Sequence, residues 1–189
     1  MMSEKREEKQ QVAVTVKVLI ADDDPPTRML LRAAIGQWGY EIVEAIDGED
    51  AWEILQRPNA PRLLILDWLM PRLDGVELCA RIKKELPYQP YIILLTQVGG
   101  TSNIIKGLEA GADEFLSKPF NMAELRSRLS VGARIIRNSL TIADQAQQLR
   151  SYLTQIEELA QERADELSHN TELLIMLTML LGYSPNEKE

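Results

Sequence analysis

Apolar and polar positions follow two different periods along the first two thirds of the chain. Short apolar runs bounded by turn residues are typical of strands, and such runs occupy residues 16–21, 41–45, 63–67, 91–96 and 114–116. Segments with helical spacing of apolar residues separate these runs and predict helices over residues 26–38, 48–55, 76–86 and 102–110. The alternation predicts an α/β fold, a doubly wound five-stranded parallel sheet with helices on both faces.

The order of the strands and details of two helices can also be predicted. Right-handed connections favour the strand order 2-1-3-4-5, which reverses between the first and third strands. The helix over residues 26–38 is expected to have one apolar face, made of Met29, Leu30, Ala33, Ala34 and Gln37. Asn121 and Glu124 predict a capping box at the start of a further helix.

From residue 121 onward the pattern changes to a seven-residue repeat without a strand signal. Its two series are Ile135, Ile142, Leu149, Ile156 and Leu177, and Ala146, Leu153, Ala160, Leu167, Leu174 and Leu181. Arg163 and Asn170 interrupt the first series, where polar residues can fix the register of a coiled coil. We expect a homodimer paired through residues 135–181. Packing back onto the sheet, or within a bundle of the same chain, is the alternative.

These patterns divide the chain into four parts. We expect a disordered tail over residues 1–14, a domain over 15–135, a coiled-coil dimerisation helix over 136–182 and a tail over 183–189. The stretch 173–181 is apolar almost all round, which a two-stranded coil would leave exposed. It therefore calls for a larger bundle, a partner protein or a further domain.

Composition and charge narrow the classes of function. The 189 residues carry a net charge of −8 with a pI of about 4.9, which disfavours nucleic acid as a partner. The single cysteine, Cys79, cannot form an internal disulfide, and this suits the reducing cytoplasm. We expect no secretory signal and no membrane span, because no apolar run approaches the ~20 residues that cross a bilayer.

Polar groups stand where four of the predicted strands end. Three acids at residues 22–24 follow the first strand, Asp67 ends the third, Thr96 ends the fourth and Lys118 follows the fifth. The carboxyl ends of parallel strands share one edge of the sheet, where ligands bind. Carboxylates gathered there require a cation, and Mg²⁺ accepts one or two carboxylates while keeping waters for an incoming phosphate. The sequence predicts a magnesium site, with Lys118 and Thr96 available to a phosphoryl oxygen.

Four segments carry these groups: VLIADDDPPTR, LLILDWLMPRLDG, LLTQ and GADEFLSKPF. In this order and spacing they resemble the response-regulator receiver domain of two-component signalling, over residues 16 to about 135. The resemblance implies a phosphoprotein of a phosphorelay, fed by a sensor histidine kinase, a phosphotransfer protein or a small phosphodonor. It implies no enzyme activity beyond self-catalysed phosphotransfer and autodephosphorylation.

The resemblance also assigns roles at the predicted site. Asp67 is expected to be the phosphoacceptor. Asp23 is expected to bind Mg²⁺ directly and Asp22 to bind it through water, with Asp67 and the backbone carbonyl of Leu69 completing the protein ligands. Lys118 is expected to pair with Asp67 and then with the phosphoryl group.

A second set of residues is implied to respond to phosphorylation. Thr96 is expected to move inward toward the phosphoryl group, and Phe115, the switch aromatic, to turn into the space that is vacated. A cis peptide is expected between Lys118 and Pro119. Gln97 departs from the small residue usual after that threonine. Leu69 and Val98 are apolar and are expected to shield the acyl phosphate from water.

Two other functions compete with that of a receiver that signals through a dimerising helix. The chain could be the regulatory front half of a larger response-regulator enzyme, a cyclic-dinucleotide cyclase, a phosphodiesterase or a phosphatase. A stand-alone phosphatase with an aspartyl nucleophile is disfavoured, because such enzymes place a second acid where Leu69 stands. His169, the only histidine, lies on the predicted coil and is expected to be solvated.

Overall fold

The computed structural model describes residues 16–97 and 101–181, without the side chains of residues 101–104. The tails predicted at residues 1–14 and 183–189, and the prediction for Val98, lie outside the described residues. The chain divides into two compact units between Ser139 and Leu140. Each unit is described by itself.

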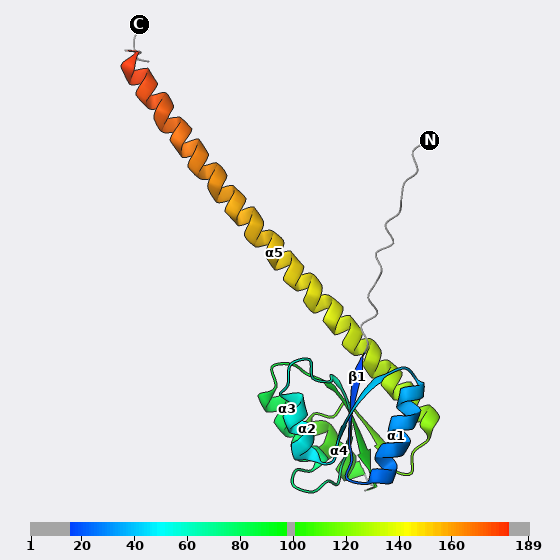
Figure 1. The fold of residues 1–189 in the computed structure, drawn as a ribbon. Coiled ribbons are helices and arrows are strands. Elements are labelled where there is room, and N and C mark those ends of the chain that lie inside the picture. The colour runs from blue at the N-terminus through cyan, green and yellow to red at the C-terminus, as the bar shows by residue number, and fades with distance from the viewer. Residues whose placement is uncertain (1–15, 98–100, 182–189) are drawn as a thin grey trace, which may run out of the picture. The chain divides into compact units, whose positions relative to one another are not determined.

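The first unit is built on a sheet of five parallel strands, which confirms the predicted order β2-β1-β3-β4-β5 (Figure 1). The strands are β1 (Lys17–Ala21), β2 (Glu41–Ala45), β3 (Leu63–Asp67), β4 (Tyr91–Thr96) and β5 (Glu114–Ser117). Every residue of β3 and β4 is buried. Burial on both faces explains why these strands read as unbroken apolar runs.

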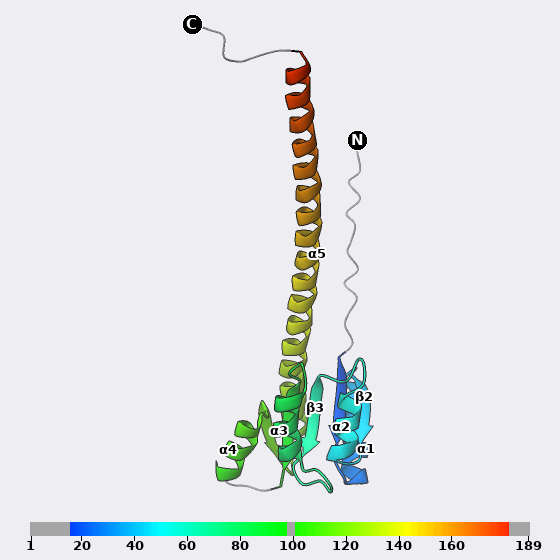
Figure 2. The same cartoon turned by 90° about the vertical axis from the view of Figure 1, so that its left-hand side faces the viewer.

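Helices cover both faces of this sheet. They are α1 (Pro25–Gln37), α2 (Gly48–Leu55), α3 (Gly75–Glu85), α4 (Thr101–Ala110) and α5 (Met122–Leu180). Figures 1 and 2 show α2, α3 and α4 on one side of the sheet and α1 on the other. The first turns of α5 lie beside α1, where the Arg126 guanidinium is 5.8 Å from the centre of the Trp38 ring. The sheet is therefore the middle of three layers.

The helix starts are set largely by aspartates. Asp24, Asp47 and Asp74 precede α1, α2 and α3, and each side chain accepts a hydrogen bond from the backbone N–H three residues later. These bonds are 3.0, 3.0 and 2.7 Å long. Each cap satisfies a backbone donor that the helix leaves without a partner. The loops that carry the polar groups of the sheet edge are thus anchored at their helical ends.

The start of α5 is capped differently from the prediction. The Asn121 side chain accepts a hydrogen bond from the Ala123 N–H at 2.7 Å, one residue before the position used in a capping box. The Glu124 carboxylate pairs with Arg128, one turn later in the helix. Arg128 also pairs with Glu114 on β5, so this end of α5 is attached to the sheet through side chains.

The predicted apolar face of α1 is wrong. Met29 and Leu30 are 73% and 54% exposed, whereas Leu31 and Ile35 are fully buried. Residues four positions apart lie on one stripe of a helix, and the Leu31–Ile35 stripe is the one that meets the sheet. The prediction failed because α1 carries apolar residues on more than one side.

The second unit consists of the α5 residues that follow Ser139. From residue 141 to residue 181 every side chain is exposed within the single chain. The repeat positions are included, with Ile142 66%, Leu153 51% and Leu167 67% exposed. The structure confirms a helix over the segment where the seven-residue repeat was found. The pairing of this helix with a second copy stays a prediction. Among the described residues, no helix combines the length and apolar character that a bilayer crossing requires.

Candidate functional site

The carboxyl ends of four strands bring the predicted polar groups together. Asp22 directly follows β1, Asp67 ends β3, Thr96 ends β4 and Lys118 follows β5. The apolar residues of β1, β3 and β4 before them are buried in the core, so the backbone leaves each polar group at the rim of the sheet. Asp22, Asp67 and Thr96 are themselves 0%, 6% and 3% exposed. The site is therefore largely buried at the sheet edge and is not a patch of surface acids.

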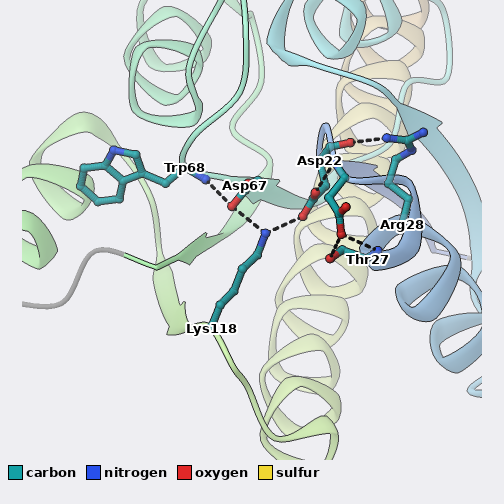
Figure 3. A network of polar contacts seen from close by, with 7 residues as sticks. Asp22, Thr27, Arg28, Asp67, Trp68 and Lys118 are labelled. Atoms are coloured by element: carbon teal, nitrogen blue, oxygen red, sulfur yellow. Dashed lines mark hydrogen bonds and ion pairs between the residues drawn. The ribbon is translucent and has the colours of Figure 1, made fainter.

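Lys118 joins the two buried carboxylates of the site. Its Nζ lies 2.7 Å from Oδ2 of Asp22 and 2.9 Å from Oδ1 of Asp67 (Figure 3). The same Oδ1 of Asp67 accepts a hydrogen bond from the Trp68 N–H at 3.0 Å. The Lys118 N–H donates to the Thr96 carbonyl at 2.7 Å, which fixes the backbone that carries the ammonium group. The peptide between Lys118 and Pro119 is cis, as predicted.

Three carboxylates of the site could hold a metal ion. Asp22, Asp23 and Asp67 each place one carboxylate oxygen within 4.8 Å of the others. Asp22 and Asp67 are buried and Asp23 is exposed. Oxygen ligands from carboxylates are the chemistry that Mg²⁺ prefers, and the exposed side leaves room for its waters. This donor set fits a magnesium ion.

The charges of the site perturb one another. Burial raises the pKa of the Asp67 carboxyl, and the charge on Asp22 raises it further; the Lys118 ammonium opposes both, and the pKa stays above its ordinary value. Burial lowers the pKa of Lys118, but its hydrogen bonds and charge pairing with Asp22 and Asp67 outweigh this, so the pKa is raised. Lys118 is thereby held as a cation beside the carboxylates.

The remaining predicted residues lie on the strands and the loop that adjoin this cluster. Thr96 is opposite Ser117 in the β4–β5 register, and Phe115 is opposite Leu94. Phe115 is partly buried, and the Leu69 side chain is 55% exposed in the loop after β3. The structure thus brings Asp22, Asp23, Asp67 and Lys118 into one cluster, with Thr96 on the neighbouring strand end.

One contact near the site was not predicted from the sequence. Arg72, in the loop after β3, forms an ion pair with Asp47, whose side chain is 5% exposed. The two residues are 25 positions apart. Arg72 lies in one of the four quoted segments, but Asp47 lies in none of them. An arginine between Pro71 and Gly75, in the loop directly after the Asp67 strand, was the available signal.

The part of the chain that carries this site matches a known protein family. Residues 18–130 match the family model described as the response regulator receiver domain. The "probable transcriptional regulator ycf27" of Cyanophora paradoxa is 42% identical over 113 residues, covering 60% of this chain and 46% of that protein. The "phosphate regulon transcriptional regulatory protein PhoB" of Pseudomonas aeruginosa is 40% identical over 118 residues, 62% of this chain and 51% of that protein. The chain spans about half the length of these curated relatives.

Solved structures have the same fold. The receiver domain of the Francisella response regulator 1452 aligns with a TM-score of 0.61 at 31% identity, over 65% of this chain and 99% of that one. The BeF3-activated N-terminal receiver domain of Klebsiella pneumoniae RstA aligns with a TM-score of 0.58 at 32% identity, over 62% of this chain and 98% of that one. Both neighbours are receiver domains, so the likeness covers the first unit of the chain.

Proposed function

The chain belongs to the response regulator receiver domain family, and we propose that it accepts a phosphoryl group on Asp67 and signals through a dimerising helix. The observation that carries this proposal is the Lys118 ammonium, which lies within 2.9 Å of both Asp22 and Asp67 at the carboxyl edge of the sheet. A carboxylate nucleophile beside a fixed cation suits phosphoryl transfer, which depends mainly on positioning and charge stabilisation.

The proposed reaction is an in-line displacement at phosphorus. One carboxylate oxygen of Asp67 forms the new O–P bond, while the N–P bond to a phosphohistidine imidazole breaks and its electron pair stays on the nitrogen. The Lys118 ammonium group then pairs with a phosphoryl oxygen. The donor is a sensor histidine kinase or a phosphotransfer protein, and a small phosphodonor can replace it.

Magnesium binding belongs to the same proposal. A bound Mg²⁺ supplies positive charge that offsets the phosphoryl oxygens. Both oxygens of Asp22 already accept hydrogen bonds, from the Asp24 N–H at 2.9 Å and from Lys118, which suits contact with the ion through water. Asp23 is exposed and suits direct ligation, with Asp67 and the backbone carbonyl of Leu69 as the other ligands.

The proposed response spreads from the strand ends. A phosphoryl group adds acceptor oxygens beside Thr96, whose hydroxyl is drawn toward them. Phe115, on the neighbouring strand and only partly buried, is proposed to turn inward in response. β5 is joined to α5 through the Glu114–Arg128 ion pair, so a shift in β5 reaches the helix that carries the seven-residue repeat.

We propose that the output is the pairing of two copies through residues 135–181. No catalytic turnover is proposed. A second candidate is supported by the exposed residues at the end of the helix, where Met179, Leu180 and Leu181 are 78%, 77% and 81% exposed. Such a stretch would also suit the regulatory front half of a larger response-regulator enzyme. The reading frame of the gene beyond residue 189 distinguishes the two.

A phosphoryl mimic tests the phosphoacceptor directly. Beryllium fluoride binds a carboxylate in the shape of a phosphoryl group, and Trp68 follows Asp67 and reports on its surroundings by fluorescence. We expect a saturable change that requires Mg²⁺, disappears in Asp67→Asn and persists in Asp74→Asn, a matched acid of the same loop. An Asp67→Asn protein that responds like the wild type would overturn the proposal.

A further inference from the structure

The loop between β3 and α3, residues 68–74, is closed at its base and held near its tip. At the base, the Gly75 N–H donates to the Trp68 carbonyl at 2.9 Å. A Cβ on Gly75 would lie 2.1 Å from the Asp67 carbonyl oxygen, so backbone packs directly on backbone there. These contacts fix the two ends of the loop. Its central residues must be held by other groups.

The tip of this loop lies against the start of α2. A Cβ on Gly48 would lie 2.1 Å from the Leu73 carbonyl oxygen. Next to this contact, Arg72 donates to Oδ2 of Asp47 through Nε at 2.7 Å and through a second guanidinium nitrogen. Asp47 also caps α2, with its other oxygen accepting from the Asp50 N–H at 3.0 Å. The buried Asp47 carboxylate is therefore fixed by the helix cap, and the Arg72 side chain is hydrogen-bonded to it.

Arg72 holds an unfavourable backbone conformation. Its φ of 66° lies in the left-handed region, which a residue with a side chain adopts at a cost that glycine does not incur. Strain of this kind persists where surrounding contacts determine the conformation. The direct side-chain contacts that Arg72 makes are with Asp47, so this ion pair opposes relaxation of the loop.

The pair also joins the two sides of the metal-binding edge. Asp47 follows β2, two residues after Ala45, and the Ala45 carbonyl accepts a hydrogen bond from the Asp22 N–H at 3.4 Å. Arg72 lies in the loop that starts at Asp67 and contains Leu69. The Arg72–Asp47 contact thus links the segment beside Asp22 to the segment beside Asp67 from outside the cluster.

We propose that Arg72 and Asp47 are positioning residues, whose ion pair holds the 68–74 loop in the conformation that binds the divalent cation. This inference rests on the proposed function, because the loop's contribution to the metal is the Leu69 carbonyl. Neither side chain belongs to the carboxylate cluster of Asp22, Asp23 and Asp67. Partners of metal ligands that act in this way change metal affinity about 10- to 100-fold when they are removed.

The test compares Mg²⁺ affinity of Arg72→Ala, Asp47→Asn and the double variant of the full chain by calorimetry. Each single variant is expected to raise the Kd about tenfold, and the double variant no further, because either change breaks the same contact. Arg72→Gly, which accepts the positive φ without strain, is expected to lie between Arg72→Ala and the wild type.

Charge alone predicts a different result. Removing the positive charge of Arg72 from near a cation site would tighten Mg²⁺ binding, whereas removing the negative charge of Asp47 would weaken it. Loss of affinity in both variants is therefore specific to the ion pair. Tighter binding by Arg72→Ala, or losses that multiply in the double variant, would overturn the inference.

Hydrogen exchange without metal separates this inference from the proposed function. The Gly75 and Leu73 amides, both bonded within the loop, are expected to exchange faster in Arg72→Ala than in the wild type. Asn59→Gly is the matched control, since Asn59 has a similar φ of 58° outside this loop, and its exchange at these amides should be unchanged. Equal exchange in Arg72→Ala contradicts the inference, while a wild type that fails to bind Mg²⁺ contradicts the proposed function.

Discussion

At the scale of single residues, the site is defined by an imbalance of charge. Three carboxylates lie within 4.8 Å of one another, and Lys118 pairs with two of them. One ammonium group cannot neutralise three acids, and like charges close together at a largely buried site raise the free energy of the folded state. A divalent cation bound at this cluster is therefore expected to stabilise it, beside the Asp67 carboxylate that is proposed to accept the phosphoryl group.

Asp23→Asn tests the cation site without disturbing the core, because Asp23 is exposed. At a concentration 100 times the Kd, Mg²⁺ should raise the free energy of unfolding of the wild type by about 2.7 kcal/mol. The gain should be largely lost in Asp23→Asn, since a direct ligand is removed. Urea unfolding with and without Mg²⁺ measures it, with Asp24→Asn as the control because asparagine also caps helices well. Equal gains in Asp23→Asn and the wild type would exclude Asp23 as a ligand.

The raised pKa of Asp67 predicts a pH dependence of stability. An acid whose pKa is raised on folding favours the folded state most when protonated, so its contribution is present below the unfolded value of about 3.8 and is lost as pH rises through the folded pKa. Asp67→Asn should therefore gain stability over the wild type as pH increases through this range, in metal-free buffer. A stability difference that stays constant from pH 3.5 to pH 7 would contradict the assignment.

Residue by residue, the sequence predicted the acids and Lys118 but not the contacts of Arg72. The acids and Lys118 could be found because each stands where an apolar run ends. Arg72 and Asp47 are far apart in sequence, and neither lies in a periodic pattern. Such a pair depends on how two loops pack together in the folded protein. A local sequence pattern therefore cannot predict it.

At the scale of elements, buried strands were predictable and the faces of the amphipathic helices less so. β3 and β4 are buried throughout, so their apolar runs leave little ambiguity. α1 exposes Met29 and Leu30 while burying Leu31 and Ile35, so hydrophobicity alone pointed to the wrong stripe. The outcome depends on which stripe meets the sheet, and that is a property of the packed layers.

The attachment of α5 to the sheet gives a prediction at this scale. A Cβ on Gly132 would lie 2.5 Å from the Tyr91 ring and 2.7 Å from Leu63. Gly132→Ala should therefore destabilise the first unit by about 1–3 kcal/mol through overpacking, although alanine favours the helix. Urea unfolding gives the value, and Gly36→Ala on α1 is the matched control.

The control variant, Gly36→Ala, is expected to change the stability in the opposite direction. A Cβ on Gly36 would meet only Ile42 Cδ1 at 3.7 Å, an ordinary contact, so alanine should stabilise α1 by about 0.5–1 kcal/mol. If Gly132→Ala stabilises the protein as much as Gly36→Ala does, α5 does not pack on the sheet at Gly132 as described.

At the scale of the whole molecule, the chain joins a receiver unit to a helix that has no covering within the described chain. The repeat positions of residues 141–181 are all exposed, and the sequence from residue 121 to residue 189 has 10 acidic and 7 basic residues. The relatives named as transcriptional regulators match only the receiver part. Pairing of two copies is the arrangement that would remove the repeat positions from water.

Charges placed on the repeat test this pairing. Leu153→Glu with Leu167→Glu puts a carboxylate at two positions of the seam and should convert a dimer of the full chain into a monomer, because like charges would face each other in the core of the coil. Gln147→Glu with Gln161→Glu adds the same charge with the same spacing, one position off the seam, and should leave the dimer intact. Sedimentation equilibrium distinguishes them, and a wild type that is monomeric at all concentrations would rule out the dimer.

Transfer of a phosphoryl group to Asp67 is the central claim, and intact mass measurement tests it most directly. The full chain, incubated with acetyl phosphate and Mg²⁺, should gain the mass of one phosphoryl group, and the gain should require the metal. Asp67→Asn should gain nothing, while Asp74→Asn should be labelled as the wild type is. Labelling of the Asp67→Asn protein to the same extent would contradict the account.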